Sequence, residues 1–224
     1  MRDGIQTILF DFDYTLADSS RAVVECVNVA FEGMGLPPVS ADAVRRTIGT
    51  SLPDTLARLA GEEHRPRAEE FRAHFRKRSD EIMVAWTEVF SVAGATAAAL
   101  REMGFRLGIV STKFRSRIQD TLQREGLLDQ FGIIVGGEDV ARFKPDPQGL
   151  LMAAERAGSR PEQVLYVGDS LTDAETARRA QARFLVVLSG MTAREEFDGY
   201  QPDGFLAHVG ELPGFLEGKR RDGG

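Results

Sequence analysis

The 224-residue sequence has a single cysteine, and none of its apolar runs reaches the length of about 20 residues that a membrane-spanning helix needs. With Cys26 alone, no disulfide can form within the chain. Cys26 lies on an apolar helical stripe, so we expect it to pack in a core without a chemical role. Positive net charge is also lacking: the formal net charge is −6, which argues against binding to nucleic acid.

Targeting signals and repeats are absent as well. The N-terminus shows no signal-peptide pattern, which favours a cytoplasmic protein without a membrane partner. The sequence contains no internal repeat and no low-complexity tract. His64, His74 and His208 have neither the spacing of metal ligands nor an acidic partner, so we assign them no role.

The stretch 8–16 is the one around which the rest of the chain is organised. The apolar run 5–10 predicts a buried strand, which ends in Asp11 and Asp13. Ligands bind at the carboxyl ends of the strands in a parallel sheet, so both carboxylates would face a binding site and repel each other. Two ionised carboxylates need a shared proton or a cation, and Mg²⁺ accepts such oxygen ligands. Taken alone, the pair could also be the polar start of an ordinary loop.

Further apolar segments end in polar residues in the same way. The polar segments are Ser111-Thr112-Lys113 after the strand expected at 105–110, Lys144-Pro145-Asp146-Pro147 after the strand expected at 132–135, and Gly168-Asp169-Ser170-Leu171-Thr172-Asp173 after the strand expected at 164–167. Each motif is weak by itself, and their order along the chain makes the combination informative.

This ordered set, D-x-D, then Ser/Thr, then Lys, then G-D-x-x-x-D, resembles the haloacid dehalogenase-like hydrolase superfamily. Within it, the chain is most similar to the phosphoglycolate phosphatase-like branch, and the resemblance covers nearly the whole sequence. The resemblance implies a Mg²⁺-dependent phosphatase. Such an enzyme would hydrolyse a small phosphorylated metabolite and act as a monomer or homodimer.

The resemblance assigns the metal and the nucleophile to the acidic residues. Asp11 would attack phosphorus and form an aspartyl-phosphate, and Asp13 would protonate the leaving oxygen and then deprotonate the hydrolytic water. Mg²⁺ would be held by the Asp11 side chain, the backbone carbonyl of Asp13 and Asp169. Asp173, one helical turn later, would orient a metal-bound water or another ligand. Helix capping is the alternative explanation for Asp169 and Asp173.

The resemblance assigns the binding of the negatively charged phosphoryl group to Ser111, Thr112 and Lys144. The Ser111 hydroxyl and the Thr112 backbone N–H would donate hydrogen bonds, and Lys144 would supply a positive charge. A helix cap is the alternative for Ser111, and a stiff surface loop is the alternative for Lys144. Lys113 would help to bind a small anionic substrate, because Ser111-Thr112-Lys113 resembles the T-N-K of phosphoglycolate phosphatase-like members.

Strand and helix patterns alternate after residue 89, which predicts right-handed βαβ crossovers and a parallel sheet. Residues 18–88 instead show helical periodicity and no strand pattern. We therefore expect an α/β protein with a doubly wound, Rossmann-like parallel sheet. Its catalytic core would consist of 1–17 and 89–224, and an all-helical cap of 18–88 would be inserted into it.

The resemblance gives the inserted helices the role of a cap that closes over the strand ends and excludes water. Its hinges would lie near 16–20 and 87–92. Arg45 and Arg46 are cap residues that could contact substrate, with a solvated helix face as the alternative. At the other end of the chain, 219–224 is expected to be frayed.

Tyr14 departs from the family pattern, which usually has glycine after the second aspartate. A non-glycine residue avoids positive φ at a steric cost, so we expect Tyr14 to keep an ordinary backbone conformation. Its ring would lie near the boundary between cap and core and adjust substrate fit without taking part in bond breaking.

Other functions remain open on the same residues. Dehalogenase members lack the second acid, so Asp13 favours phosphoryl chemistry. Phosphosugar mutases tend to carry an arginine just after the glycine that matches Gly49, and Thr50-Ser51-Leu52-Pro53 has none. A pyrophosphatase, or a non-catalytic binding or regulatory protein, could use the same fold, because a fold does not establish a function.

Overall fold

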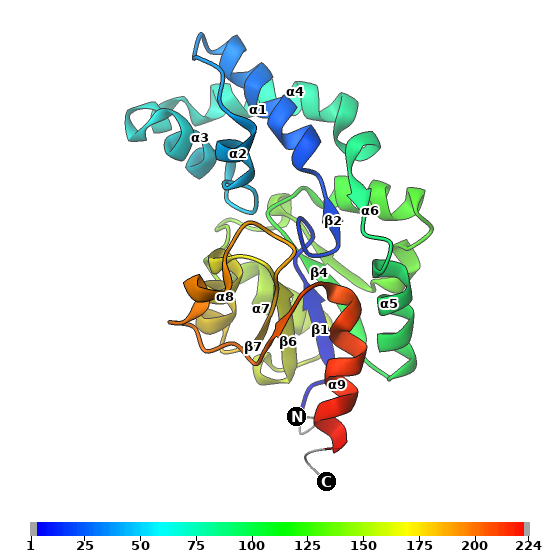
Figure 1. Cartoon of the computed structure of the whole chain (residues 1–224). Helices are drawn as coiled ribbons and strands as arrows, with labels where there is room; N and C mark the ends of the chain where they lie inside the picture. The colour runs from blue at the N-terminus through cyan, green and yellow to red at the C-terminus, as the bar shows by residue number, and fades with distance from the viewer. Residues whose placement is uncertain (1–3, 222–224) are drawn as a thin grey trace. The chain divides into compact units, whose positions relative to one another are not determined.

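The structure is a computed structural model that describes residues 4–221. The chain divides into two compact units, one of Met1–Ala17 with Val89–Gly224 and one of Asp18–Glu88. The first unit is built around a parallel sheet, and the second is built from helices (Figure 1). The expected fold class, an α/β core with a doubly wound parallel sheet and a helical insertion, is confirmed.

The first unit contains, within residues 4–221, a six-stranded sheet in the order β5-β4-β1-β6-β7-β8. Its strands are β1 Thr7–Phe10, β4 Arg106–Val110, β5 Ile133–Val135, β6 Val164–Gly168, β7 Arg183–Val187 and β8 Phe205–Leu206. Each neighbouring pair is parallel. From β1 the chain proceeds outward on one side to β5 and then returns to β6 on the other side. The ends of β1, β4 and β6 therefore form a topological switch point, where α/β sheets bind ligands.

Helices cover both faces of this sheet. Successive strand residues point to opposite faces, so each strand contributes side chains to the core on either side. Ile8 and Phe10 belong to the core beneath α5 (Ala93–Glu102), α6 (Arg115–Arg124) and α9 (Leu212–Arg221). Leu9 belongs to the core beneath α7 (Gln148–Arg156) and α8 (Leu171–Ala180). Figure 1 shows α9 beside α5, in agreement with the contacts between these two helices.

The second unit consists of helices that enclose a core of their own. The helices are α1 Ser20–Gly33, α2 Ala41–Arg45, α3 Leu52–Ala60 and α4 Ala68–Trp86. Phe31, Leu56 and Phe71 are buried between them, as their helical spacing predicts. Cys26 is fully buried on α1, so its expected core position is confirmed. Pro66 lies in a 3-10 segment, η1 Glu62–Arg67, and α4 begins directly after this segment.

The two chain segments that join the units form short strands. β2 (Ala17–Asp18) and β3 (Glu88–Val89) make a separate two-stranded sheet. Next to them, the Phe90 N–H donates to the Leu16 carbonyl at 2.9 Å. The expectation that 18–88 contains no strand is therefore wrong at its two end residues. A two-residue strand has no alternation for a sequence pattern to reveal.

The remaining boundaries differ little from the expected ones, except at the end of the chain. The last helix, α9, continues to Arg221. Helix thus extends into the segment 219–224 that was expected to be frayed, and its last three residues lie outside the described part. Shorter 3-10 segments are η2 Leu128–Gln130, η3 Gly137–Asp139, η4 Pro161–Gln163, η5 Arg194–Phe197 and η6 Val209–Glu211. Over the described residues, we find no helix with both the length and the apolar character for crossing a membrane.

Candidate active site

The carboxyl ends of the central strands bring three of the expected motifs together. Asp11 directly follows β1, Ser111 directly follows β4 and Asp169 directly follows β6. All three side chains are buried. The Asp11 N–H donates to the Val167 carbonyl at 2.9 Å, which ties the end of β1 to its neighbour β6. Sheet order therefore places residues from distant parts of the sequence at one site.

Asp11, Asp169 and Asp173 form a buried cluster in which one oxygen from each carboxylate lies within 4.8 Å of the others. Burial raises the pKa of Asp11 to about 7; Lys144 opposes this rise, while the charges of Asp173 and Asp13 add to it. The pKa of Asp169 is also raised well above its ordinary value, first by burial and then by Asp173 and Asp11. Burial and the nearby carboxylates thus both disfavour the charged forms of Asp11 and Asp169.

These residues fit a divalent cation. Their donor atoms are carboxylate oxygens, the ligands that hard cations prefer. Oδ1 of Asp11 is buried and accepts no hydrogen bond with good geometry, although Lys144 Nζ lies 3.1 Å away as an ion-pair partner. A bound cation would give this oxygen a partner and favour the charged carboxylates, which burial and mutual repulsion disfavour. The triad is therefore able to bind a metal ion.

Lys144 is a buried cation of the site, so a surface-loop role is excluded for it. Its Nζ lies 3.1 Å from Asp11 Oδ1 and 2.6 Å from Asp173 Oδ1. Nζ also donates to the Tyr166 hydroxyl at 3.1 Å. Burial by itself lowers the pKa of Lys144, but the charges of Asp11 and Asp173 outweigh it and raise the pKa above its ordinary value. Lys144 therefore remains charged beside the carboxylates.

Asp173 is held by donors on both of its oxygens. Oδ1 accepts from Lys144 at 2.6 Å and from the Tyr166 hydroxyl at 3.0 Å. Oδ2 accepts from the Ser170 hydroxyl at 2.6 Å and from the Ser170 N–H at 3.2 Å. Ser170 in turn accepts from the Asp173 N–H at 3.1 Å, which completes a capping box at the start of α8. Helix capping is therefore a real role of Asp173, and it acts together with the pairing to Lys144.

Asp13 and Lys113 form a second buried pair. Lys113 Nζ donates to both Asp13 oxygens, at 3.1 and 3.3 Å. Their side chains are 6% and 9% exposed, so water screens this pair little. The carboxylate of Asp13 is not a member of the triad, and Lys113 lies against it instead of facing outward for a substrate. The charge expected to attract an anionic substrate thus contacts the expected acid/base residue.

Ser111 takes part in the turn after β4. Its hydroxyl accepts from the Lys113 N–H at 3.3 Å, while Thr112 between them is half-buried. The alternative that Ser111 caps a helix is wrong, since α6 begins at Arg115 and its exposed N–H groups are satisfied elsewhere. Glu138 accepts from the N–H of Arg115 at 2.8 Å and of Ser116 at 3.4 Å. A carboxylate from η3 therefore caps α6.

Residues that the sequence did not point to also shape the site. Thr15 donates to Asp169 Oδ1 at 3.3 Å. Ser189, in the loop after β7, donates to the Tyr14 carbonyl at 2.5 Å. A Cβ atom on the next residue, Gly190, would lie 1.9 Å from Asp169 Oδ2, so no side chain fits there. Sequence patterns could not reveal the two hydrogen bonds, because they join residues that are 154 and 175 positions apart along the chain.

Tyr14 has a φ of 59°, so the expectation of an ordinary backbone conformation is wrong. The turn requires this value because it folds back tightly: the Tyr14 N–H donates to the Ala17 carbonyl at 2.7 Å, and Leu16 and Ala17 both donate to the Phe12 carbonyl. The glycine that the family usually has at this position therefore suits the positive φ of the turn. Tyrosine meets it at a steric cost of about 1–2 kcal/mol, and its buried ring offsets that cost.

Arg45 and Arg46, the two candidates for substrate contact in the second unit, lie on a solvated helix face. Arg45 Nη1 pairs with Asp42 Oδ1 at 3.1 Å, and both side chains are exposed. Arg46 is the exposed residue that ends α2. Surface pairs of this kind contribute little to stability and leave these side chains in water.

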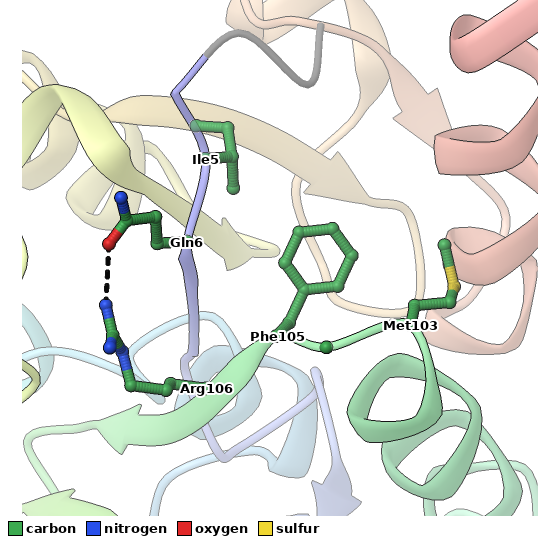
Figure 2. Close-up of a pocket in the computed structure, with 6 residues that line it drawn as sticks. Ile5, Gln6, Met103, Phe105 and Arg106 are labelled. Carbon is green, nitrogen blue, oxygen red and sulfur yellow. Dashed lines mark hydrogen bonds between the residues drawn. The ribbon is translucent and has the colours of Figure 1, made fainter.

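A separate hollow of about 330 Å³ lies at the opposite edge of the sheet, where β1 and β4 begin. It is lined by Ile5, Gln6, Met103, Gly104, Phe105 and Arg106. Figure 2 shows Arg106 donating to Gln6 across one side of it, at 2.7 Å. Its lining includes no carboxylate, and parallel sheets bind ligands at the other edge, so we place the chemistry at the acidic triad.

Comparison with known proteins agrees with this geometry. A family model described as haloacid dehalogenase-like hydrolase matches residues 8–187, and the chain belongs to this family. A crystal structure of a haloacid dehalogenase-like hydrolase from Bacteroides fragilis superposes with a TM-score of 0.89 at 43% identity, covering 93% of this chain and 99% of that one. The expected family and the expected class of hydrolase are thus confirmed.

Curated relatives span nearly the same length. A phosphoglycolate phosphatase from Aquifex aeolicus is 32% identical over 208 residues, covering 93% of this chain and 95% of the relative. The pyrophosphatase PpaX from Listeria monocytogenes is 29% identical over 217 residues, covering 95% and 96%. Both names describe enzymes that release phosphate from small molecules.

Proposed function

We propose that this chain is a Mg²⁺-dependent phosphatase that hydrolyses a small phosphate monoester through an aspartyl-phosphate on Asp11. The observation that carries the proposal is the arrangement around Asp11: a buried carboxylate oxygen without a hydrogen bond, a second carboxylate, Asp169, and a buried cation, Lys144. The similarity to a phosphoglycolate phosphatase supports the same chemistry. The similarity to a pyrophosphatase makes pyrophosphate the second candidate substrate.

In the first half of the reaction, an Asp11 oxygen attacks phosphorus while the bond from phosphorus to the leaving oxygen breaks. Asp13 gives its proton to the leaving oxygen, so the departing group is a neutral alcohol. Lys113 contacts Asp13 in the free protein, and a proton on Asp13 would weaken this pair. We infer that substrate binding separates Lys113 from Asp13 before the proton is transferred.

In the second half, water attacks phosphorus and Asp13 accepts its proton. The bond between phosphorus and Asp11 then breaks, which releases inorganic phosphate and restores the Asp11 carboxylate. Ser111, the Thr112 N–H and Lys144 would donate to the phosphoryl oxygens throughout. Residues 18–88 would act as the cap that excludes water and limits the substrate to small molecules.

Asp11, Asp169 and the Asp13 carbonyl would hold the ion, with Asp173 orienting Lys144 and a ligand of the ion. Bound Mg²⁺ would neutralise negative charge on the carboxylates and on the phosphoryl group. In this assignment Asp173 does not bind the ion directly, because its oxygens already accept hydrogen bonds from Lys144, Tyr166 and Ser170.

The test compares Asp11→Asn with Asp120→Asn, which removes the charge of an exposed carboxylate on α6. Phosphate release from 2-phosphoglycolate, p-nitrophenyl phosphate and pyrophosphate is measured with Mg²⁺ and with EDTA. We expect Asp11→Asn to lose turnover while circular dichroism stays unchanged, and Asp120→Asn to match the parent. EDTA should stop turnover, Mg²⁺ should restore it, and Ca²⁺ should substitute poorly because its coordination is larger and looser. Ordinary turnover by Asp11→Asn, or full activity in EDTA, would reject the proposal.

A further inference from the structure

Tyr166 is a large, fully buried side chain with a polar oxygen in an otherwise apolar strand. It lies in the core formed with α7 and α8, and its ring packs near Phe184, with the ring centroids 6.3 Å apart. Phenylalanine would fill this space equally well. Burying a hydroxyl is costly unless it forms hydrogen bonds, so the oxygen needs an explanation of its own.

The hydroxyl of Tyr166 contacts three other groups of the site. Its single O–H proton is within hydrogen-bond distance of Asp173 Oδ1, at 3.0 Å, and of the Val110 carbonyl, at 2.9 Å, and its oxygen accepts from Lys144 Nζ at 3.1 Å. Val110 is the last residue of β4, directly before Ser111, and β1 lies between β4 and β6. The tyrosine therefore reaches past the strand of the nucleophile and links three of the four motifs.

The Lys144 ammonium has three polar neighbours: it donates hydrogen bonds to two of them and forms an ion pair with Asp11. These are Asp11 Oδ1 at 3.1 Å, Asp173 Oδ1 at 2.6 Å and the Tyr166 hydroxyl at 3.1 Å. Lys144 lies in a loop between η3 and α7, so no helix or strand fixes its backbone. Its charge is consequently held in place by what its side chain contacts. The tyrosine oxygen is the one neutral partner, and it lies 3.0 Å from Asp173 Oδ1, so these two oxygens contact the ammonium from the same side.

We propose that the Tyr166 hydroxyl is a positioning group that holds the Lys144 ammonium between Asp11 and Asp173, where it can contact the phosphoryl group. This inference rests on the proposed phosphatase function for its consequence in turnover, but not for its consequence in phosphate binding. Without the hydroxyl, the ammonium loses one of the three contacts that fix its position and is free to shift. The charge that stabilises the transferring group is then displaced from Asp11.

The Tyr166→Phe variant isolates this effect. It keeps the ring, including the face that lies 5.8 Å from Lys144 Nζ, and removes only the hydroxyl. We expect kcat to fall by about tenfold, the amount that corresponds to one hydrogen bond of about 1.4 kcal/mol, with KM changing less. The dissociation constant of inorganic phosphate, measured by calorimetry with Mg²⁺ present, should rise by several-fold. The Mg²⁺ concentration for half-maximal thermal stabilisation should stay within about twofold.

The matched control is Tyr200→Phe, which removes the hydroxyl of a tyrosine that packs against the same core and is not among the hydrogen-bond partners of Lys144 and Asp173. It should leave turnover, phosphate binding and Mg²⁺ binding unchanged. The second comparison repeats Tyr166→Phe in a Lys144→Met background. If Tyr166 acts through Lys144, the double variant should bind phosphate as weakly as Lys144→Met alone.

The outcomes separate this inference from the proposed function. If the parent protein shows no turnover with Mg²⁺ but binds phosphate, and the double variant matches Lys144→Met, the phosphatase proposal fails and the positioning role stands. Equal phosphate affinity of the parent and Tyr166→Phe would overturn the positioning role. So would an added loss of affinity in the Lys144→Met background, a parallel loss of Mg²⁺ binding, or a loss of cooperative unfolding by Tyr166→Phe. Each of these last results would give the hydroxyl a merely structural role.

Discussion

The backbone of Tyr14 can be tested by exchanging its side chain for two small ones. At a φ of 59°, alanine keeps the steric strain of the left-handed region, whereas glycine does not. Tyr14→Ala and Tyr14→Gly both remove a ring that is only 7% exposed, so both should lose about 3–5 kcal/mol of stability. The two variants lose nearly the same amount of stability with the ring. The difference in stability between them therefore measures the backbone strain at residue 14.

The size of the difference follows from two opposing contributions. Relief of strain favours glycine by about 1–2 kcal/mol, and the greater freedom of glycine in the unfolded chain disfavours it by about 0.5–1 kcal/mol. We expect Tyr14→Gly to be more stable than Tyr14→Ala by about 0.5–1 kcal/mol. At an ordinary φ the order would be reversed, with alanine ahead by about 0.4–1 kcal/mol.

Urea unfolding followed by far-ultraviolet circular dichroism measures the difference between the two variants. Two controls calibrate it. Gln181 ends α8 at a φ of 58° and is exposed, so Gln181→Gly should gain stability. Ala98 lies inside α5, so Ala98→Gly should lose about 1 kcal/mol. If the controls behave and Tyr14→Ala is at least as stable as Tyr14→Gly, the left-handed turn is refuted.

Two further predictions concern the acidic triad. The folded-state pKa of Asp11, about 7, lies above its ordinary value of 3.8, so its contribution to stability is complete below pH 3.8 and is lost as the pH rises through 7. The thermal midpoint of the EDTA-treated protein should therefore fall between pH 5 and pH 8, and saturating Mg²⁺ should reverse most of that fall; an unchanged midpoint in EDTA would contradict the raised pKa. Gly190→Ala should raise the Mg²⁺ concentration needed for half-maximal thermal stabilisation by about tenfold or more, because its Cβ would lie 1.9 Å from Asp169 Oδ2. Gly199→Ala, whose Cβ would meet nothing within 4 Å, is the matched control, and equal Mg²⁺ dependence of the two variants would show that the loop after β7 does not constrain the site.

Much of this protein is readable in the chain because its chemistry lies next to its strands. Asp11, Ser111 and Asp169 each directly follow a strand, and the apolar run before each one indicates that strand. Alternation of strands and helices then implies a parallel sheet whose carboxyl ends meet at one edge. Local hydrophobic pattern and the rules of βαβ connection were therefore sufficient for the fold class and for the residues near the strand ends.

Contacts across the fold were beyond such patterns. Periodicity predicts that Tyr166 is buried in its strand, but not that its hydroxyl meets Val110 and Lys144, which are 56 and 22 residues away along the chain. The same holds for Ser189, which donates to the carbonyl of Tyr14 from 175 residues away. These partners depend on sheet order and on the paths of loops, which hydrophobic periodicity does not encode.

Tyr14 shows the same division within a single residue. Its sequence neighbours identify the turn after the first strand, and side-chain chemistry alone favours an ordinary φ there. The φ of 59° instead results from hydrogen bonds that close the turn and from burial of the ring, which together outweigh the local steric preference. The chain by itself thus determined where the turn and the acidic residues lie. Tertiary packing decided the backbone conformation and the side-chain pairing, because both are set by groups that meet only in the folded molecule.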